Sequence, residues 1–189
     1  LRQKIFKGYG YQYLFLLFLF RSVIIPHISK GVTKVMERIT SFQVDHNKIV
    51  PGMYVSRIDG DITTFDLRVK KPNAGDYMSH LEMHTTEHMV ATFIRNSEIG
   101  QNIIYFGPMG CRTGFYLLTR DLPKATVYKI LKQVLKDIIN YSGEVFGASE
   151  IECGNYRELN LESAKKICRE YLHILENYSG TDADFEYPQ

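Results

Sequence analysis

The alternation of apolar and polar residues predicts several short strands in the middle of the chain. Residues 38–44 and 53–58 carry strand-like runs, and residues 62–69 (ITTFDLRV) alternate as a half-buried strand does. The intervening sequence DGD has turn chemistry, so the last two runs are expected to form a hairpin. Residues 103–106 and 113–119 add two strands, which a glycine-containing turn separates.

Segments with helical periodicity lie between and after these strands. Ser79 followed by Glu82 is a capping-box signature, and it predicts a helix that continues to about Arg95. Pro123 begins a long amphipathic helix, and a last helix begins near Asn160. The order is strands, helix, strands, helix, helix. This order predicts an α+β fold, in which a mainly antiparallel sheet packs with helices in a single compact domain.

The first 35 residues differ from the rest of the chain. Residues 14–20 form an unbroken apolar run, LFLLFLF, which Arg21 interrupts. A spanning helix needs about 20 consecutive apolar residues, so no membrane insertion is expected. A translated upstream segment, a membrane-associating anchor and a structural extension remain open. We therefore expect residues 1–35 to be an extension outside the fold and residues 36–189 to form the functional domain.

Composition excludes some classes of protein. The chain is 44% hydrophobic and 23% charged, as in soluble globular proteins, and its formal net charge of +2 comes without a basic block. Binding to nucleic acid is therefore not expected. The three cysteines are odd in number and include no CxxC, which favours a reducing, cytoplasmic location. Each of them is a core residue, a metal ligand or a nucleophile.

The strongest local signal is the sequence HTTEH at residues 84–88. On a helix, His84 and His88 lie one turn apart and project to the same side, so both imidazoles can reach one divalent cation. Glu87 lies near the edge of that face, where a carboxylate can transfer protons without being a ligand. The alternative is a pair of surface histidines on an exposed helix. The complete HxxEH on a capped helix favours the metal.

A catalytic metal commonly has three protein ligands and one open position, so a third donor is needed. Cys153 is the better of the two later thiols, because it precedes Gly154 in a polar segment between helices. Cys168 follows Ile167 on the apolar side of the last helix and is expected to be a core residue.

The third cysteine, Cys111, lies in the glycine-rich sequence GPMGCRTG. Flanking glycines let the backbone approach a ligand and leave the thiol accessible. Arg112 would favour the thiolate. The residues alone leave two possibilities for Cys111, a reactive thiol or a buried cysteine of a turn.

Taken together, these segments resemble the S-ribosylhomocysteine lyases, the LuxS family. The matching pieces are SFQVDHNKI (41–49), FDLRVKKPN (65–73), HTTEH (84–88), GPMGCRTGFY (107–116) and ECGNYR (152–157). The resemblance extends from about Met36 to beyond Arg169 and does not include residues 1–35.

The resemblance implies one divalent metal in each subunit, with His84, His88 and Cys153 as its ligands. The metal of the family is iron(II), which zinc or cobalt can replace. The catalytic acid and base of the family map to Cys111 and Glu87.

The resemblance also implies a homodimer whose two active sites lie at the subunit interface. Substrate-binding residues of the family map to Ser41, His46 and Arg68, on segments that reach the neighbouring subunit's site. The small-molecule substrate, S-ribosylhomocysteine, is cleaved to homocysteine and 4,5-dihydroxy-2,3-pentanedione. The second product is the precursor of a quorum-sensing autoinducer, and the reaction recycles a by-product of the methyl cycle.

This chemistry explains why two proton-transfer groups are needed. The sugar carbonyl must migrate from C1 to C3 before the thioether can leave by β-elimination, and each migration moves a proton between carbons. A Lewis-acid metal stabilises the charge that develops on oxygen. Cys111 and Glu87 suit the two proton transfers.

The sequence departs from the family pattern at one strand. Many relatives have an aspartate and a serine before the PMGC turn, where this chain has Tyr105 and Gly107. Two other functions share some of the signals. An inverted-motif zinc peptidase also uses HxxEH, and a non-catalytic binding module could use the same three ligands as a structural site.

Overall fold

The computed structural model describes residues 36–188, so the expectation for residues 1–35 falls on a part of the chain outside the described residues. The elements in order are η1 (Thr40–Phe42), β1 (Gly52–Asp59), β2 (Ile62–Arg68), α2 (His80–Arg95), η2 (Gly100–Asn102), β3 (Ile103–Pro108), β4 (Gly114–Arg120), α3 (Lys124–Asn140), η3 (Tyr156–Glu158), α4 (Leu161–Leu175) and η4 (Asp182–Phe185). From Arg38 onward the described chain forms one compact unit. The described helices include none that is both long and apolar enough for a membrane span.

The four strands form one antiparallel sheet in the order β1-β2-β4-β3. The DGD turn joins β1 to β2 as predicted, and Gly60 adopts a φ of 61° there, which a glycine accepts without strain. The register pairs Arg68 at the end of β2 with Gly114 at the start of β4. This pairing places the end of β2 beside the turn that carries Cys111.

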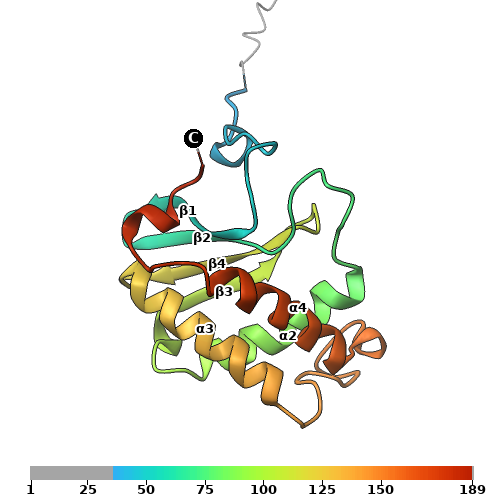
Figure 1. Cartoon of the computed structure of the whole chain (residues 1–189). Helices are drawn as coiled ribbons and strands as arrows, with labels where there is room; N and C mark the ends of the chain where they lie inside the picture. The colour runs from blue at the N-terminus through green and yellow to red at the C-terminus, as the bar shows by residue number, and fades with distance from the viewer. Residues whose placement is uncertain (1–35, 189) are drawn as a thin grey trace, which may run out of the picture. The chain divides into compact units, whose positions relative to one another are not determined.

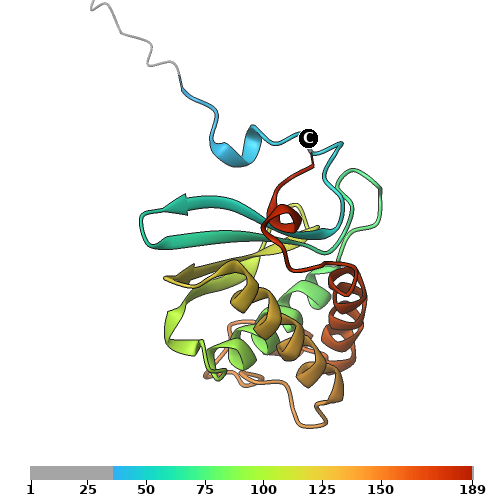
Figure 2. The same cartoon turned by 60° about the vertical axis from the view of Figure 1, so that its left-hand side comes forward.

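All three long helices lie on one face of the sheet, as Figures 1 and 2 show from two directions. The strands alternate as the pattern predicted, so every second side chain points at the helices. Side chains that are fully buried between the two layers include Phe65, Leu67, Leu117, Ile94, Leu131 and Ile167. The α+β architecture expected from the sequence is confirmed.

Helix α2 begins where the sequence predicted. The Ser79 side chain accepts a hydrogen bond from the backbone N–H of Glu82 at 3.2 Å, and the Glu82 carboxylate accepts one from the backbone N–H of Ser79 at 2.8 Å. The Lys166 ammonium lies 2.7 Å from the same carboxylate and ties α4 to the start of α2. These contacts fix the end of the helix from which the HTTEH side chains project.

The strand expected at residues 38–44 is wrong. The segment contains the short helix η1, in which the backbone N–H of Phe42 donates to the carbonyl of Ile39 at 2.9 Å, and the Arg38 side chain donates to the carbonyl of Phe42. No described strand pairs with it, and hydrogen bonds within the segment replace those of a ladder. The segment lies across the sheet from the three helices (Figures 1 and 2).

Candidate functional site

Three side chains from two distant segments meet beside α2. The ligand atoms of His84, His88 and Cys153 all lie within 4.8 Å of one another. The Cys153 sulfur is 3.4 Å from Nε2 of His84. In a tetrahedral zinc site, bonds of about 2.3 Å to sulfur and 2.1 Å to nitrogen place such a pair about 3.6 Å apart. The spacing therefore fits two ligands of one metal.

A backbone carbonyl fixes the orientation of the second imidazole. The Phe146 carbonyl lies 2.8 Å from Nδ1 of His88, and a carbonyl can only accept, so Nδ1 carries the proton. This tautomer leaves Nε2 available as a ligand, as in most histidine metal sites. Gly147 packs beside the same ring, where a Cβ would lie 2.9 Å from Nδ1.

The loop that supplies this carbonyl and Cys153 is itself anchored. The Phe146 ring packs against Phe93 of α2 and against Tyr141, with ring centroids 5.9 and 5.4 Å apart. Within the loop, the backbone N–H of Cys153 donates to the carbonyl of Ser149 at 3.0 Å. The backbone N–H of Asn155 donates to the Cys153 sulfur at 3.4 Å. A sulfur that accepts a backbone hydrogen bond suits a thiolate ligand.

Glu87 faces a hollow beside this cluster. The hollow is lined by His80, Met83, His84, Glu87, Pro108, Asn155 and Glu158. Burial raises the pKa of the Glu87 carboxyl and outweighs His84 and His88, whose charges act in the opposite direction. A carboxyl with a raised pKa is a better proton donor near neutral pH. Its position beside the three ligand atoms allows it to exchange protons with a molecule bound there.

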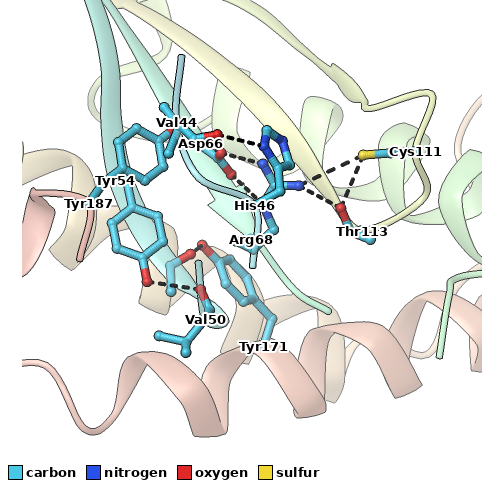
Figure 3. A network of polar contacts seen from close by, with 11 residues as sticks. Val44, His46, Val50, Tyr54, Asp66, Arg68, Cys111, Thr113, Tyr171 and Tyr187 are labelled. Carbon is cyan, nitrogen blue, oxygen red and sulfur yellow. Dashed lines mark hydrogen bonds and ion pairs between the residues drawn. The ribbon is translucent and has the colours of Figure 1, made fainter. Parts of the chain in front are cut away.

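A second cluster surrounds Cys111, whose side chain is exposed (Figure 3). The sulfur lies 3.0 Å from the Thr113 hydroxyl and 3.8 Å from Nη1 of Arg68. The same Nη1 donates to Thr113 at 2.5 Å. The expectation that Arg112 supports this thiol needs correcting, because the Arg112 guanidinium lies over the ring of Tyr77, 5.6 Å from its centroid.

A buried ion pair holds the Arg68 guanidinium. Arg68 is 2% exposed and donates to both carboxylate oxygens of Asp66, at 3.1 and 2.5 Å. Burial opposes the charged form, but the charge of Asp66 and the hydrogen bonds to it outweigh that cost, and the pKa of Arg68 is raised. The guanidinium is therefore a fixed positive charge beside Cys111.

The two remaining predicted substrate-binding residues lie on the segment that precedes β1. The His46 ring nitrogen Nδ1 lies 2.9 Å from the carbonyl of Val44. Ser41 lines a hollow on the sheet face opposite the helices, together with Tyr105 and Tyr116. Among residues 36–188, no hydrogen bond or ion pair joins either residue to the metal-ligand cluster. The contacts of Ser41, His46 and Arg68 with substrate stay predictions.

The two residues that depart from the family pattern, Tyr105 and Gly107, lie against each other in β3. The Tyr105 ring lies over Gly107, where an added Cβ would be 2.4 Å from the ring atom Cζ. A residue larger than glycine at position 107 would require this half-exposed ring to turn aside. The tyrosine thus covers the space that a serine side chain would use. Tyr105 is 48% exposed, and its strand continues into Pro108 at the Glu87 hollow.

Sequence reasoning missed Asp66, which connects to Cys111 through Arg68, and Thr113, whose hydroxyl contacts the thiol directly. A signal for Asp66 was present, because FDLR alternates two charged residues with two apolar ones on a strand whose apolar residues face the helices. Thr113 became relevant only through the register between β2 and β4.

Comparison with known proteins agrees with this arrangement. The family model of S-ribosylhomocysteinase (LuxS) matches residues 39–181. An S-ribosylhomocysteine lyase of Finegoldia magna is 46% identical over 147 residues, which cover 75% of this chain and 94% of the relative. The lyase of Borreliella burgdorferi is 43% identical over 81% of this chain and 100% of the relative. The lyase of Clostridium acetobutylicum is 43% identical over 82% and 100%. The chain belongs to the S-ribosylhomocysteinase (LuxS) family.

Proposed function

We propose that this chain is a metal-dependent S-ribosylhomocysteine lyase, which forms homocysteine and 4,5-dihydroxy-2,3-pentanedione. The family match and the names of three relatives support this reaction. The single observation that carries it is the convergence of the His84, His88 and Cys153 ligand atoms within 4.8 Å, beside Glu87. The dione is the precursor of a quorum-sensing autoinducer.

The three converging residues hold one divalent cation. Iron(II) is the proposed native metal, with zinc or cobalt as substitutes, since imidazole and thiolate ligands suit these metals. When bound, the cation supplies a Lewis acid for the carbonyl oxygens of the sugar. His88 contributes Nε2, because its Nδ1 donates to the carbonyl of Phe146. The residues that transfer protons are distinct from these ligands.

Cys111 and Glu87 are the proposed acid and base. Moving the carbonyl from C1 to C3 requires protons to leave one carbon and return to its neighbour, and elimination then removes one more proton. The sulfur that accepts such a proton lies 3.8 Å from the fixed positive charge of Arg68. The half-buried Glu87 carboxyl exchanges protons with the sugar oxygens.

Ser41, His46 and Arg68 are the proposed substrate contacts, on segments that reach the neighbouring subunit's site. A homodimer is supported by the sheet face opposite the helices, which leaves Tyr105 48% and the adjoining Ile39 58% exposed. A second copy that packs on this face would cover both.

The defining experiment is an assay of free homocysteine. Purified, anaerobically handled enzyme is expected to release thiol from S-ribosylhomocysteine. Cys111→Ala should retain metal and fold but lose thiol release, and substantial residual turnover would refute its role. His84→Ala should lose metal by elemental analysis. Peptide hydrolysis without thiol release would instead support an inverted-motif peptidase.

Mixing two inactive variants tests the shared site. If His46 serves the neighbouring subunit's metal, mixed dimers of His46→Ala and His84→Ala contain one intact site out of two. Random exchange makes half of the dimers mixed, so about a quarter of the wild-type activity should return. No recovery above the separate variants would place both residues in one subunit's site. The same mixing with Cys111→Ala identifies the subunit whose thiol serves each metal.

Residues 36–189 are the proposed catalytic domain. The family match begins at residue 39, which supports this boundary. Deletion of residues 1–35 is expected to leave thiol release unchanged, and an insoluble or inactive product would show that the segment contributes. The cytoplasmic location expected from the cysteines stays a prediction.

A further inference from the structure

The chain after α4 returns to the sheet and ends beside β1 (Figures 1 and 2). Phe185, which is 1% exposed, anchors this C-terminal segment in the core. Two residues later, the Tyr187 ring stacks on Tyr54 of β1, with centroids 4.8 Å apart and planes inclined by 23°. The stack holds the Tyr187 phenol on the sheet face opposite the helices, where Asp66 also lies (Figure 3).

The Tyr187 phenol adds a third hydrogen-bond donor to the buried carboxylate of Asp66. The Tyr187 hydroxyl donates to Oδ2 of Asp66 at 2.8 Å, in addition to the two donors from Arg68. Asp66 is 1% exposed, so water contributes little to its solvation. Burial and the charge of Asp66 raise the pKa of Tyr187 well above its ordinary value, which keeps the phenol a donor.

A continuous series of polar contacts connects this phenol to the reactive thiol. Asp66 binds the Nε and Nη2 side of the Arg68 guanidinium, which leaves Nη1 for Thr113 at 2.5 Å and for Cys111 at 3.8 Å. The guanidinium is planar and rigid, so the position of its Asp66 side determines the direction of Nη1. Figure 3 shows the sequence of contacts from Tyr187 to Cys111.

We propose that Tyr187 is a positioning residue for Cys111: its hydroxyl fixes Asp66, and Asp66 in turn keeps the Arg68 guanidinium directed at the thiol. The inference rests on the proposed function of Cys111 as the proton-transfer thiol. The family model matches residues 39–181, so Tyr187 lies outside the matched residues. The C-terminal segment thus adds a support that the family match does not include.

The physical effect follows from the buried carboxylate. Without the phenol hydroxyl, Oδ2 of Asp66 loses one of its donors in a place that water barely reaches. The carboxylate then either draws the Arg68 guanidinium closer or admits a water molecule beside it. Both responses weaken the hold of Nη1 on Thr113 and Cys111, and both make the thiol less reactive.

Two matched substitutions in the same segment test the proposal. Tyr187→Phe removes the hydroxyl and keeps the ring on Tyr54. Tyr178→Phe also removes a half-buried hydroxyl from the segment, but that hydroxyl accepts from the backbone N–H of Met53 at 3.0 Å and, among residues 36–188, makes no hydrogen bond to Arg68 or Asp66. Both variants are compared with the wild-type holoenzyme for thermal stability, steady-state thiol release and the rate at which iodoacetamide alkylates Cys111, followed by peptide mass spectrometry.

Tyr187→Phe is expected to slow both Cys111 alkylation and kcat by about three- to tenfold, the effect of one lost hydrogen bond. KM should stay within about twofold, because no substrate contact is removed. Tyr178→Phe should lower the melting temperature similarly but leave alkylation and kcat unchanged. Wild-type alkylation in Tyr187→Phe, or equal losses in both variants, would overturn the proposal. Slower alkylation in Tyr187→Phe alongside a wild-type enzyme that releases no thiol would uphold the positioning and reject only the function.

Discussion

Gly147→Ala should weaken metal binding although residue 147 is not a ligand. Gly147 has a φ of +70° and lies beside the His88 imidazole. A Cβ at this position would be 2.9 Å from Nδ1 and 3.1 Å from Cε1 of the ring. Ordinary contact begins near 3.5 Å, so the ring or the loop must move by about half an ångström.

The magnitude follows from what that movement disrupts. The hydrogen bond from Nδ1 of His88 to the Phe146 carbonyl, 2.8 Å long, involves the residue directly before Gly147. Loss of such a support to a ligating histidine typically lowers metal affinity by about 10- to 100-fold, which corresponds to about 1.4–2.7 kcal/mol. The left-handed backbone adds about 1 kcal/mol of lost folding stability, because alanine has a Cβ that glycine lacks.

A second glycine separates these two effects. Gly75 also has a left-handed φ, +83°, but nothing lies within 4 Å of the Cβ that alanine would add there. Gly75→Ala should therefore lose about 1 kcal/mol of unfolding free energy and keep its metal affinity. Competition between each variant and a chelating zinc indicator gives the affinity, and urea unfolding gives the stability.

The reasoning would be refuted by either of two results. A folded Gly147→Ala that binds zinc within twofold of wild type would show that the imidazole does not depend on this contact. An equal loss of affinity in Gly75→Ala would show that general destabilisation, rather than the ring contact, controls the metal.

Three further predictions concern the thiols and the helix. Thr113→Val, which keeps the side-chain shape but removes the hydroxyl shared by Arg68 and Cys111, should lower kcat about tenfold at unchanged metal content; undiminished turnover contradicts it. Burial raises the pKa of Cys168 to about 12, so Cys168→Ala should leave alkylation and thiol release unchanged and alter only the unfolding free energy. Ser79→Ala should cost about 1 kcal/mol in urea unfolding, and an unaltered midpoint would show that the cap is dispensable.

Local chemistry made part of the candidate site predictable. The capping box fixed the start of α2, and helical geometry alone brings two side chains four residues apart to the same side. The five residues HTTEH are therefore enough to predict that His84 and His88 project to the same side. Cys153 was harder, because its approach to His84 depends on a loop 69 residues away. Its polar segment beside Gly154, the apolar surroundings of Cys168 and the family resemblance indicated it.

The environment of Cys111 was less predictable. Arg112 is its neighbour in sequence, but a φ of 61° at Arg112 turns that residue's side chain toward Tyr77. Arg68, 43 residues earlier, contacts the sulfur because the register of β2 and β4 places it there. The contact between Tyr187 and Asp66 spans 121 residues and has no local signature. Residues 38–44 were predicted to be a strand from their local pattern alone. They do not form one, because no described strand pairs with them.

A backbone hydrogen bond also links the two clusters of the candidate site. The metal ligands project from α2 and a loop, whereas Cys111 lies on a turn of the sheet. The backbone N–H of Met78, directly before the cap of α2, donates to the carbonyl of Arg112 at 3.0 Å. Met78 is fully buried, so this bond is shielded from water and difficult to replace. The start of α2 is thus attached to the residue after Cys111, and the thiol turn and the helix that carries both histidines have to move together.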